Sequence, residues 1–428
     1  MNQDSVLRRR ESSVSPSRGM AFPDLRESFL HKVAAWRAFG GKTRESRLGH
    51  VPVFTNEFWT SRQRHAGSLH EISYRACFKP QLPAFFIEHL SAPGDVVYDP
   101  FMGRGTTVIE ALLHRRVPLG CDVNPLCRLL TEPRLHPPPA ARVEERLEEL
   151  DLDRPVELED SLHVFYHPKT LRQITNLRDH LLTRENQGTL DEVDDWIRMV
   201  ATSRLTGHSS GFFSVYTMPP NQAVSVASQR KINARRKQRP EFRSIKPLIL
   251  KKTRSLLRDL EIVKDVKACR GRVALFTGSA RETPRIADSL VSLIVTSPPF
   301  LDTVDYHKDN WLRCWFNGVD TSGLEIAAFR SLEVWTAFMK SAFLEFARVL
   351  SPGGFMAFEV GEVRRGKVRL EEAVLEVAAA LPMDHRLDPV CALINAQDFT
   401  KTSNCWGVRN NTCGTNSNRI VVFEKPRI

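Results

Sequence analysis

The sequence predicts an α/β fold, in which a doubly wound, mostly parallel, Rossmann-like sheet is interrupted by a mainly helical insertion. From about Phe78 to Leu135, short apolar segments of strand length alternate with helical patterns, and this alternation favours a parallel sheet with crossover helices. The alternation stops at Pro137-Pro138-Pro139 and returns at Arg272–Phe276. One sheet built from both halves of the chain is the simplest architecture that explains the gap.

The elements expected before the insertion surround a glycine-rich stretch. Pro83–Leu90 has the apolar pattern of a helix, and Pro93-Gly94-Asp95 has turn residues. A strand at Val96–Tyr98, a helix at Thr106–His114 and a strand at Pro118–Cys121 follow closely. After the insertion we expect strands at 272–276 and 290–295, a helix at 335–350, a turn at 351–354, a strand at 355–360, a helix at 370–381 and a closing strand at 419–423.

The same pattern divides the chain into four stretches. Residues 1–50 are polar and Arg-rich, so we expect a disordered or loosely ordered basic region with one helix around Phe29–Phe39. Residues 51–136 form the first part of the sheet domain and 270–428 form the second part. Residues 137–269 form the basic, helical insertion, with a loop at Gly207–Val224.

Composition narrows the functional classes. The 428-residue chain has a net charge of +11 and no apolar run long enough to span a membrane. Its N-terminus lacks the apolar core of a secretory signal. The eight cysteines are scattered, without the spacing of a zinc site. These features predict a cytoplasmic protein with reduced thiols, no membrane segment and no metal.

Asp99–Thr107 is a glycine-rich loop that follows a strand and opens a helix, the position at which doubly wound folds bind ligands. It lacks the GxGxxG of a dinucleotide site and the Lys-Ser/Thr of a phosphate loop. Asp122 ends the next strand, where an acid accepts hydrogen bonds from ribose hydroxyls. The two features together predict a nucleoside cofactor.

Thr296–Phe300 combines acceptors with a flat apolar ring at the end of a predicted strand. Pro298 and Pro299 stop the strand and supply no N–H, which leaves the Ser297 hydroxyl and the Ser297 and Pro298 carbonyls as acceptors. With Phe300 as a stacking face, the segment suits the amino group of a flipped nucleobase. A proline-terminated strand with a core phenylalanine explains the pentapeptide alone equally well.

The stretch 230–254 is a concentrated basic segment. It holds eleven Lys and Arg residues against one acid, Glu241, and so accounts for nearly all of the excess charge of +11. A solvated helix face usually carries both signs, so the segment indicates a surface that contacts phosphates. The residues predicted to bind nucleic acid are Arg230, Lys231, Arg235, Arg236, Lys237, Arg239, Lys251 and Lys252. The nearby loop Ser209–Asn221 fits either base contacts or a packed core.

Asp99–Thr107 and Thr296–Phe300 together resemble the paired signature of amino-methylating DNA methyltransferases, which modify cytosine N4 or adenine N6 with S-adenosylmethionine. The first is similar to their cofactor motif DPFxGxGTT, and the second to their catalytic motif (D/N/S)PP(Y/F/W). Phe78–Leu82, Gly278–Glu282 and Arg348–Gly354 resemble further segments of the family. The cofactor motif comes first here, which looks like a permuted order, and the aromatic residue is Phe300 where tyrosine is commoner.

The resemblance implies a Rossmann-like methyltransferase sheet, S-adenosylmethionine as cofactor and a set of site residues. The catalytic residues it implies are Ser297, Pro298, Pro299 and Phe300. The cofactor-binding residues it implies are Lys79, Pro80, Asp99, Pro100, Phe101, Gly103, Gly105, Thr106, Thr107, Asp122, Gly278 and Ser279. Because Phe300 only needs to stack, its lack of a hydroxyl is compatible with activity.

The resemblance also implies the substrate and partners. The serine form of the catalytic motif favours cytosine N4 over adenine N6 in double-stranded DNA, with a cognate restriction endonuclease as a further partner. Methylation at cytosine C5 needs a nucleophilic thiolate, usually in a Pro-Cys context, and the chain has no Pro-Cys dipeptide. The alternatives are an RNA methyltransferase and a non-catalytic nucleic-acid-binding protein on this fold. An NAD-dependent enzyme is disfavoured because GxGxxG is missing.

Overall fold

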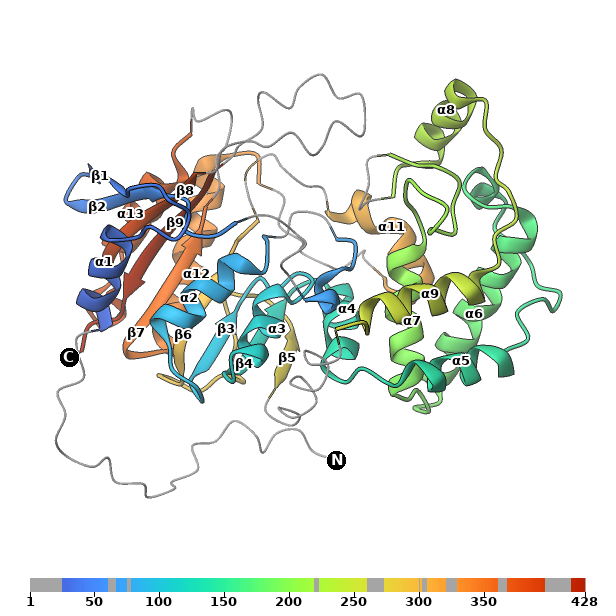
Figure 1. Ribbon diagram of the computed structural model, residues 1–428, viewed down its shortest axis with the longest axis horizontal. Helices are drawn as coiled ribbons and strands as arrows, with labels where there is room; N and C mark the ends of the chain where they lie inside the picture. Colours follow the sequence, from blue (N-terminus) through green and yellow to red (C-terminus); the bar gives the residue numbers. More distant parts are fainter. Residues whose placement is uncertain are drawn as a thin grey trace.

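The computed structural model describes residues 25–60, 67–74, 78–218, 223–259, 273–299, 301, 306–320, 329–360, 368–396 and 417–427. Figure 1 shows a twisted sheet with helices on both faces and, beside the β5 edge of that sheet, a separate group of helices. The sheet domain and the helical insertion predicted from the sequence therefore both form. Phe300 lies outside the described residues.

The sheet has nine strands in the order β1-β2-β8-β9-β7-β6-β3-β4-β5. Neighbours from β5 to β7 pair in parallel, whereas β9 is antiparallel to both β7 and β8. The strands are β1 (Arg44–Leu48), β2 (Val51–Asn56), β3 (Val96–Asp99), β4 (Val117–Asp122), β5 (Ala274–Thr277), β6 (Val291–Thr296), β7 (Leu350–Glu359), β8 (Asp388–Ala396) and β9 (Ser417–Glu424). The mostly parallel, doubly wound prediction is confirmed.

Helices cover the two faces because side chains of the central strands alternate between them. Val97, Leu293 and Val295 pack with α1 (Leu25–Ala34) and α2 (Gln81–Leu90) in one buried cluster. Tyr98 and Ile294, the residues between them in sequence, pack with α12 (Leu332–Val349) and α13 (Leu370–Ala379) in another. A strand buried on both sides reads as a continuous apolar run, which is the pattern that made β6 predictable.

The helical part shares a third buried cluster with helices that leave the sheet. Its helices are α4 (Pro125–Leu135), α5 (Ala140–Glu149), α6 (Pro168–Asn186), α7 (Glu192–Arg204), α8 (Val226–Arg236), α9 (Ile245–Leu256) and α11 (Tyr306–Asn317), joined by the short helices η3 (Ser68–His70) and η4 (Asp160–Val164), and α3 (Thr106–Leu113) adds residues from the sheet side. Trp196 is fully buried and donates from Nε1 to Thr253 Oγ1 at 3.0 Å. Since α11 follows β6 in sequence, two separate stretches of chain build this part.

The structure corrects the expectation of a loosely ordered region over residues 25–50. These residues form α1 and the edge strand β1, and α1 buries Phe29 and Val33 against the sheet. Strand β1 escaped prediction because most of its side chains are exposed, so its sequence shows no buried face. Strand β8 and helix α11 were also not predicted. Residues 1–24 lie outside the described part.

The predicted turn at Ser351–Gly354 lies inside a longer strand. β7 pairs with β6 from Leu350 onward, and the register between them shifts between Val291 and Leu293. Gly353 has a φ of +78° within this irregularity. The turn residues thus form a bulge that β7 absorbs. Among the described helices, none is long and apolar enough to cross a membrane.

Candidate functional site

The candidate site lies at the carboxyl ends of four neighbouring strands, in the order β4-β3-β6-β7. The chain leaves β3 toward β4 and β5 on one side, and leaves β6 toward β7 on the other, so the winding direction reverses between β3 and β6. Such a switch point is where open α/β sheets bind ligands. The strands end at Asp122 (β4), Asp99 (β3), Thr296 (β6) and Glu359 (β7).

The glycine loop is held in a conformation that requires its glycines. Gly105 has a φ of +73°, and a Cβ there would overlap the Thr131 side chain of α4. Gly103 donates its backbone N–H to Asp122 Oδ2 at 2.9 Å. The loop therefore follows β3 tightly and opens α3 at Thr106, with α4 packed directly behind it.

Asp122 connects the glycine loop with the loops that follow β4 and β5. Its other carboxylate oxygen accepts from Asn124 N at 2.9 Å, and its backbone carbonyl accepts from Gly278 N at 3.0 Å. Burial raises the pKa of this carboxyl, and the Asn124 and Gly103 N–H groups oppose the rise. The sequence predicted a ribose acceptor here. The structure adds that the same carboxylate shapes the loop.

Asp99 is a second, more deeply buried carboxyl at this edge. It is 1 % exposed, and burial raises its pKa to about 7, with the Asp122 charge adding to the rise. Its Oδ1 accepts from Thr296 Oγ1 at 2.6 Å and from Phe101 N at 3.1 Å. A parallel contact joins Thr107 Oγ1 to the Val295 carbonyl at 3.2 Å. The cofactor loop and the catalytic motif are thus bonded to each other side by side.

The guanidinium of Arg104 points away from these acids, although Arg104 lies within the glycine loop. Its Nη1 donates to the Ile72 carbonyl at 2.9 Å, and its Nε donates to Thr106 Oγ1 at 3.3 Å. Arg134 of α4 donates to the Leu69 carbonyl at 3.0 Å and to the Arg104 carbonyl. Both guanidinium groups brace the loop from behind. The strand-end side therefore keeps the acidic character that Asp99 and Asp122 give it.

The segment after β6 is fixed by bonds to two other elements. Ser297 donates its hydroxyl to the buried carboxylate of Glu359, the last residue of β7. The Pro299 carbonyl accepts from Trp335 Nε1 of α12 at 2.9 Å. Among the described residues, none donates to the carbonyl of the buried Pro298. That carbonyl stays open as an acceptor, as the sequence predicted.

Glu359, Trp335 and Asn418 were missed by sequence reasoning. Glu359 is 5 % exposed and accepts from Asn418 Nδ2 of β9 at 2.5 Å. The available signal was position, because Glu359 ends a buried strand just as Asp99 and Asp122 do. The contact with Asn418 depends on the antiparallel pairing of β7 with β9, which no local pattern shows.

The other predicted cofactor residues occupy the margins of this edge. Pro80 precedes the first residue of α2, and the Lys79 carbonyl accepts from Leu82 N at 3.0 Å. Pro100 is buried, and the partly buried Phe101 ring packs against Phe338 and Phe346 of α12. The loop after β5 holds Gly278 and Ser279, and a Cβ at Gly278 would meet nothing within 4 Å. The space beside Gly278 is therefore open.

The basic stretch separates into an exposed half and a structural half. Arg230, Lys231, Arg235, Lys237, Arg239 and Lys251 are exposed, and no described residue pairs with their side chains. Arg236 is also exposed and lies over the Tyr216 ring at 3.7 Å. Figure 1 shows α8, which carries most of these residues, at the upper edge of the helical part.

Lys252 differs from the expectation of a nucleic-acid contact. Its side chain is only 11 % exposed, its Nζ lies 3.6 Å from Glu71 Oε2, and burial lowers its pKa to about 8. Two further basic residues of α9 are also engaged: Lys246 Nζ donates to the Leu150 carbonyl at 2.6 Å, and Arg254 pairs with Glu144 at 3.0 Å. We therefore leave these α9 residues out of the candidate surface.

The described part of the loop 209–221 supports the packed reading. Phe212 and Phe213 are buried, and Arg204 lies over the Phe212 ring at 4.1 Å. Arg243 donates to the carbonyls of Ser209, Phe212 and Ser214 and so ties the loop to the start of α9. Residues 219–222, including the two prolines, lie outside the described residues.

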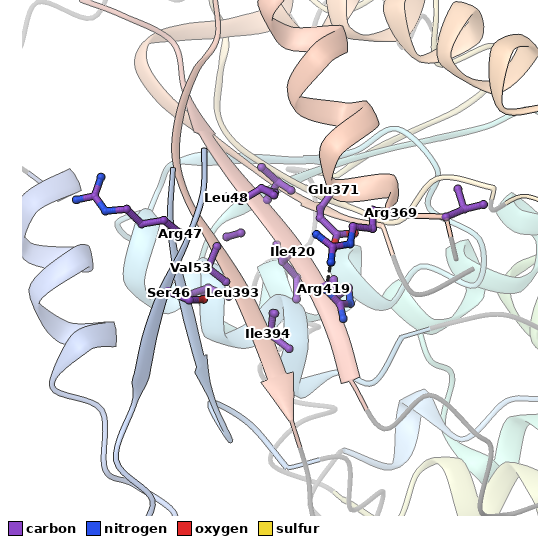
Figure 2. Close-up of a pocket in the computed structure, with 13 residues that line it drawn as sticks. Ser46, Arg47, Leu48, Val53, Arg369, Glu371, Leu393, Ile394, Arg419 and Ile420 are labelled. Atoms are coloured by element: carbon purple, nitrogen blue, oxygen red, sulfur yellow. Dashed lines mark hydrogen bonds and ion pairs between the residues drawn. The ribbon is translucent and has the colours of Figure 1, made fainter. Parts of the chain in front are cut away.

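A groove of about 240 Å³ opens on another part of the sheet, between β1, β2, β8, β9 and α13. None of the predicted site residues lines it. Figure 2 shows Arg419 bonded to Glu371 in this groove, and their nitrogen and oxygen atoms lie 2.7 Å apart. The groove therefore has charges that are already paired and is separate from the strand-end site.

Comparisons with known proteins agree with the geometry at the strand ends. Residues 38–131, which contain the glycine loop, match a family model described as DNA methylase, N6_N4_Mtase. The chain is similar to the type II methyltransferase M.MjaII of Methanocaldococcus jannaschii, with 34% identity over 74 residues, 17% of this chain and 14% of that protein. It is similar to M.BsoBI of Geobacillus stearothermophilus, with 26% identity over 288 residues, 59% of this chain and 53% of that protein. The chain thus spans at most about half the length of these relatives.

Solved structures with a comparable arrangement include TrmN from Thermus thermophilus, with 13% identity and a TM-score of 0.33 over 85% of this chain and 53% of that one. Another is the rRNA methyltransferase aviRa from Streptomyces viridochromogenes, with 12% identity and a TM-score of 0.33 over 86% of this chain and 94% of that one. The fold assignment here rests on the strand order and helix layers of the chain itself.

Proposed function

Because these matches place the chain in the family of amino-methylating DNA methyltransferases, we propose that it transfers a methyl group from S-adenosylmethionine to the exocyclic amino group of a base in double-stranded DNA. One observation carries the proposal most directly. The glycine loop and the Thr296–Pro299 segment are bonded to each other at the sheet's switch point, through Asp99 and Thr296 at 2.6 Å. A donor site and an acceptor site for one small group would therefore be adjacent.

The chemistry of the site fits S-adenosylmethionine, which supplies an electrophilic methyl group on a positively charged sulfur. Asp99 and Asp122 raise each other's cost of ionisation, so a cationic ligand is favoured over a phosphate-bearing one. Arg104, the basic residue of the loop, faces away. Asp122 would accept from ribose hydroxyls, and the open space beside Gly278 leaves room for the nucleoside.

The residues after β6 would orient the base. The Ser297 hydroxyl oxygen and the Pro298 carbonyl accept the two amino hydrogens, which directs the nitrogen lone pair out of the plane of the base. Phe300 would stack on the flipped base. Catalysis then consists of positioning and of stabilising the charge that develops on nitrogen. Trp335 assists by fixing the Pro299 carbonyl.

DNA would bind through the exposed basic residues of α8. Arg230, Lys231 and Arg235 are exposed and have no acidic partner among the described residues, so they are available to phosphates. Contacts to phosphates position a protein on DNA but do not read sequence. We therefore assign α8 to affinity and not to the choice of site.

The serine of the catalytic motif supports cytosine N4 as the methylated position, with adenine N6 as the alternative. The type II relatives support a second proposal, that a restriction endonuclease with the same recognition sequence is the functional partner. Methylation by this protein would then protect DNA from that endonuclease.

The test is methyl transfer from labelled S-adenosylmethionine to duplex DNA and to RNA, followed by nucleoside analysis. We expect label in DNA as N4-methylcytosine, and a rate that falls at least 100-fold in Ser297→Ala. Label in N6-methyladenine would overturn the choice of base, and label in RNA alone would overturn the choice of polymer. If calorimetry detected no cofactor binding, the chain would be a non-catalytic nucleic-acid-binding protein.

A further inference from the structure

Two consecutive hydroxyl side chains at the end of β6 donate to buried acids on opposite sides. Thr296 donates to Asp99 on β3 at 2.6 Å, and Ser297 donates to Glu359 on β7. The first bond joins the catalytic segment to the cofactor loop. The second joins it to a carboxylate that belongs to neither motif, and the proposed chemistry has so far given that carboxylate no role.

Glu359 is arranged as a hydrogen-bond acceptor. Asn418 Nδ2 donates to its Oε1 at 2.5 Å, and Ser297 donates its hydroxyl hydrogen. Both neighbours are neutral donors, which favours the ionised carboxylate, whereas burial of the side chain opposes ionisation. Arg419, the residue after Asn418, bonds Glu371 instead and does not neutralise the site.

The direction of the Ser297–Glu359 bond determines what Ser297 can offer to a base. A hydroxyl has one hydrogen and two lone pairs, and its hydrogen rotates to whichever acceptor is best. An ionised carboxylate has no hydrogen to donate, so it takes the hydrogen of Ser297. The lone pairs of Ser297 then face the remaining directions, where an amino group can donate to them.

We propose that Glu359 is a positioning residue that fixes the Ser297 hydroxyl as an acceptor, so that the site selects a base bearing an amino group over one bearing a carbonyl group. This inference rests on the proposed function, since it concerns the same base. It also implies that Ser297 and Glu359 act as one unit with a single negative charge. The unit should tolerate moving that charge from one residue to the other.

Charge exchange between the two positions gives the sharpest test. Glu359→Gln keeps an acceptor for Asn418, but its amide donates to Ser297 and turns the serine hydrogen toward the base. Ser297→Asp places two acids in contact. In the double variant the new amide donates to the new carboxylate, and that carboxylate again presents only lone pairs to the base.

We expect single-turnover methylation of duplex DNA to fall about 100-fold in each single variant and to recover at least tenfold in the double variant. Glu359→Asp keeps the direction of the bond and should retain more activity than Glu359→Gln. Independent losses that multiply in the double variant would overturn the proposal. The comparison of Ser297→Asp with the double variant stays decisive even if Glu359→Gln alone does not fold.

A binding measurement without cofactor provides a second readout. Wild-type protein should prefer a duplex with the amino-bearing target base over one whose target base carries a carbonyl at that position. Glu359→Gln should lose or reverse this preference, because its Ser297 hydrogen points at the base, while affinity for non-target duplex stays unchanged. An unchanged preference would overturn the proposal.

The two failures are distinguishable. Wild-type protein that methylates no DNA would refute the proposed function itself. Wild-type protein that methylates DNA, with a Glu359→Gln variant of equal rate and equal base preference, would refute only the role of Glu359.

Discussion

The strand-end site and the α8 surface are opposite in their electrostatic construction. At the strand ends, buried acids are bonded to their neighbours, and the pKa of Asp99 is raised to about 7. On α8, basic side chains such as Arg230 and Arg235 are exposed and have no partner among the described residues. The difference indicates two tasks. A preorganised acidic site suits a small cationic ligand, and an unpaired basic surface suits a polyanion.

Removing the hydroxyl at the strand-end site should have the largest effect. Ser297→Ala deletes an acceptor for the amino group and should lower the methylation rate 100- to 1,000-fold, as loss of a positioned transition-state contact does. Cofactor affinity by calorimetry and DNA affinity by anisotropy should change little. Ser292→Ala, on the same strand, is the matched control and should keep full rate. An equally slow Ser292→Ala would show that the loss is structural.

Filling the glycine loop should destabilise the sheet side of the comparison. Gly105→Ala combines a positive φ of +73° with an overlap with Thr131, so we expect a loss of about 2–4 kcal/mol in unfolding free energy, measured in urea. Gly94→Ala is the control, because its φ is +92° but no atom lies within 4 Å of its Cβ. It should cost about 1–2 kcal/mol. Equal costs would refute the packing role of Gly105.

The buried acid should make stability depend on pH. Asp99 has a pKa of about 7 in the fold against an ordinary value of 3.8, so between these values the folded protein holds a proton that the unfolded chain has lost. Its contribution therefore lowers stability as pH rises through this window. Asp99→Asn keeps the acceptor and cannot ionise, so the variant should exceed wild type by up to a few kcal/mol at pH 8 and by little at pH 4. Urea unfolding at several pH values checks this, and a difference independent of pH would contradict it.

Neutralising the α8 surface should have the smallest effect on the fold and a graded effect on DNA. Changing Arg230, Lys231 and Arg235 together to alanine should leave the melting temperature unchanged and reduce the salt dependence of DNA affinity by about 0.9 per lost phosphate contact. Lys252→Ala is the contrasting variant. It should lower the melting temperature, because Lys252 pairs with Glu71, and leave the salt dependence unchanged. The opposite pattern would reassign DNA contact to α9.

Local patterns were sufficient for the parts of the fold that bury both sides of an element. The apolar run before Ser297 and the glycine loop after Tyr98 could be placed from sequence because burial and tight turns restrict residue type. Strand β1 could not, since its side chains are mostly exposed and its pairing with β2 is set by the rest of the sheet. Glu359 could not be assigned a role either, because its contacts come from β6 and β9.

The basic stretch shows the same limit at the level of function. Sequence reasoning grouped Lys252 with Arg230 because both lie in one charged run. The structure separates them, since one faces Glu71 inside the protein and the other faces solvent. Charge density in the sequence predicted the surface, and only tertiary packing shows which residues belong to it.

The most direct measurement is the identity of the methylated nucleoside formed in duplex DNA by wild-type protein with labelled S-adenosylmethionine, with Ser297→Ala in parallel. The account predicts N4-methylcytosine from the wild type and at least 100-fold less product from the variant. Transfer of no label to DNA by a protein that binds the cofactor, or equal product from Ser297→Ala, would contradict it.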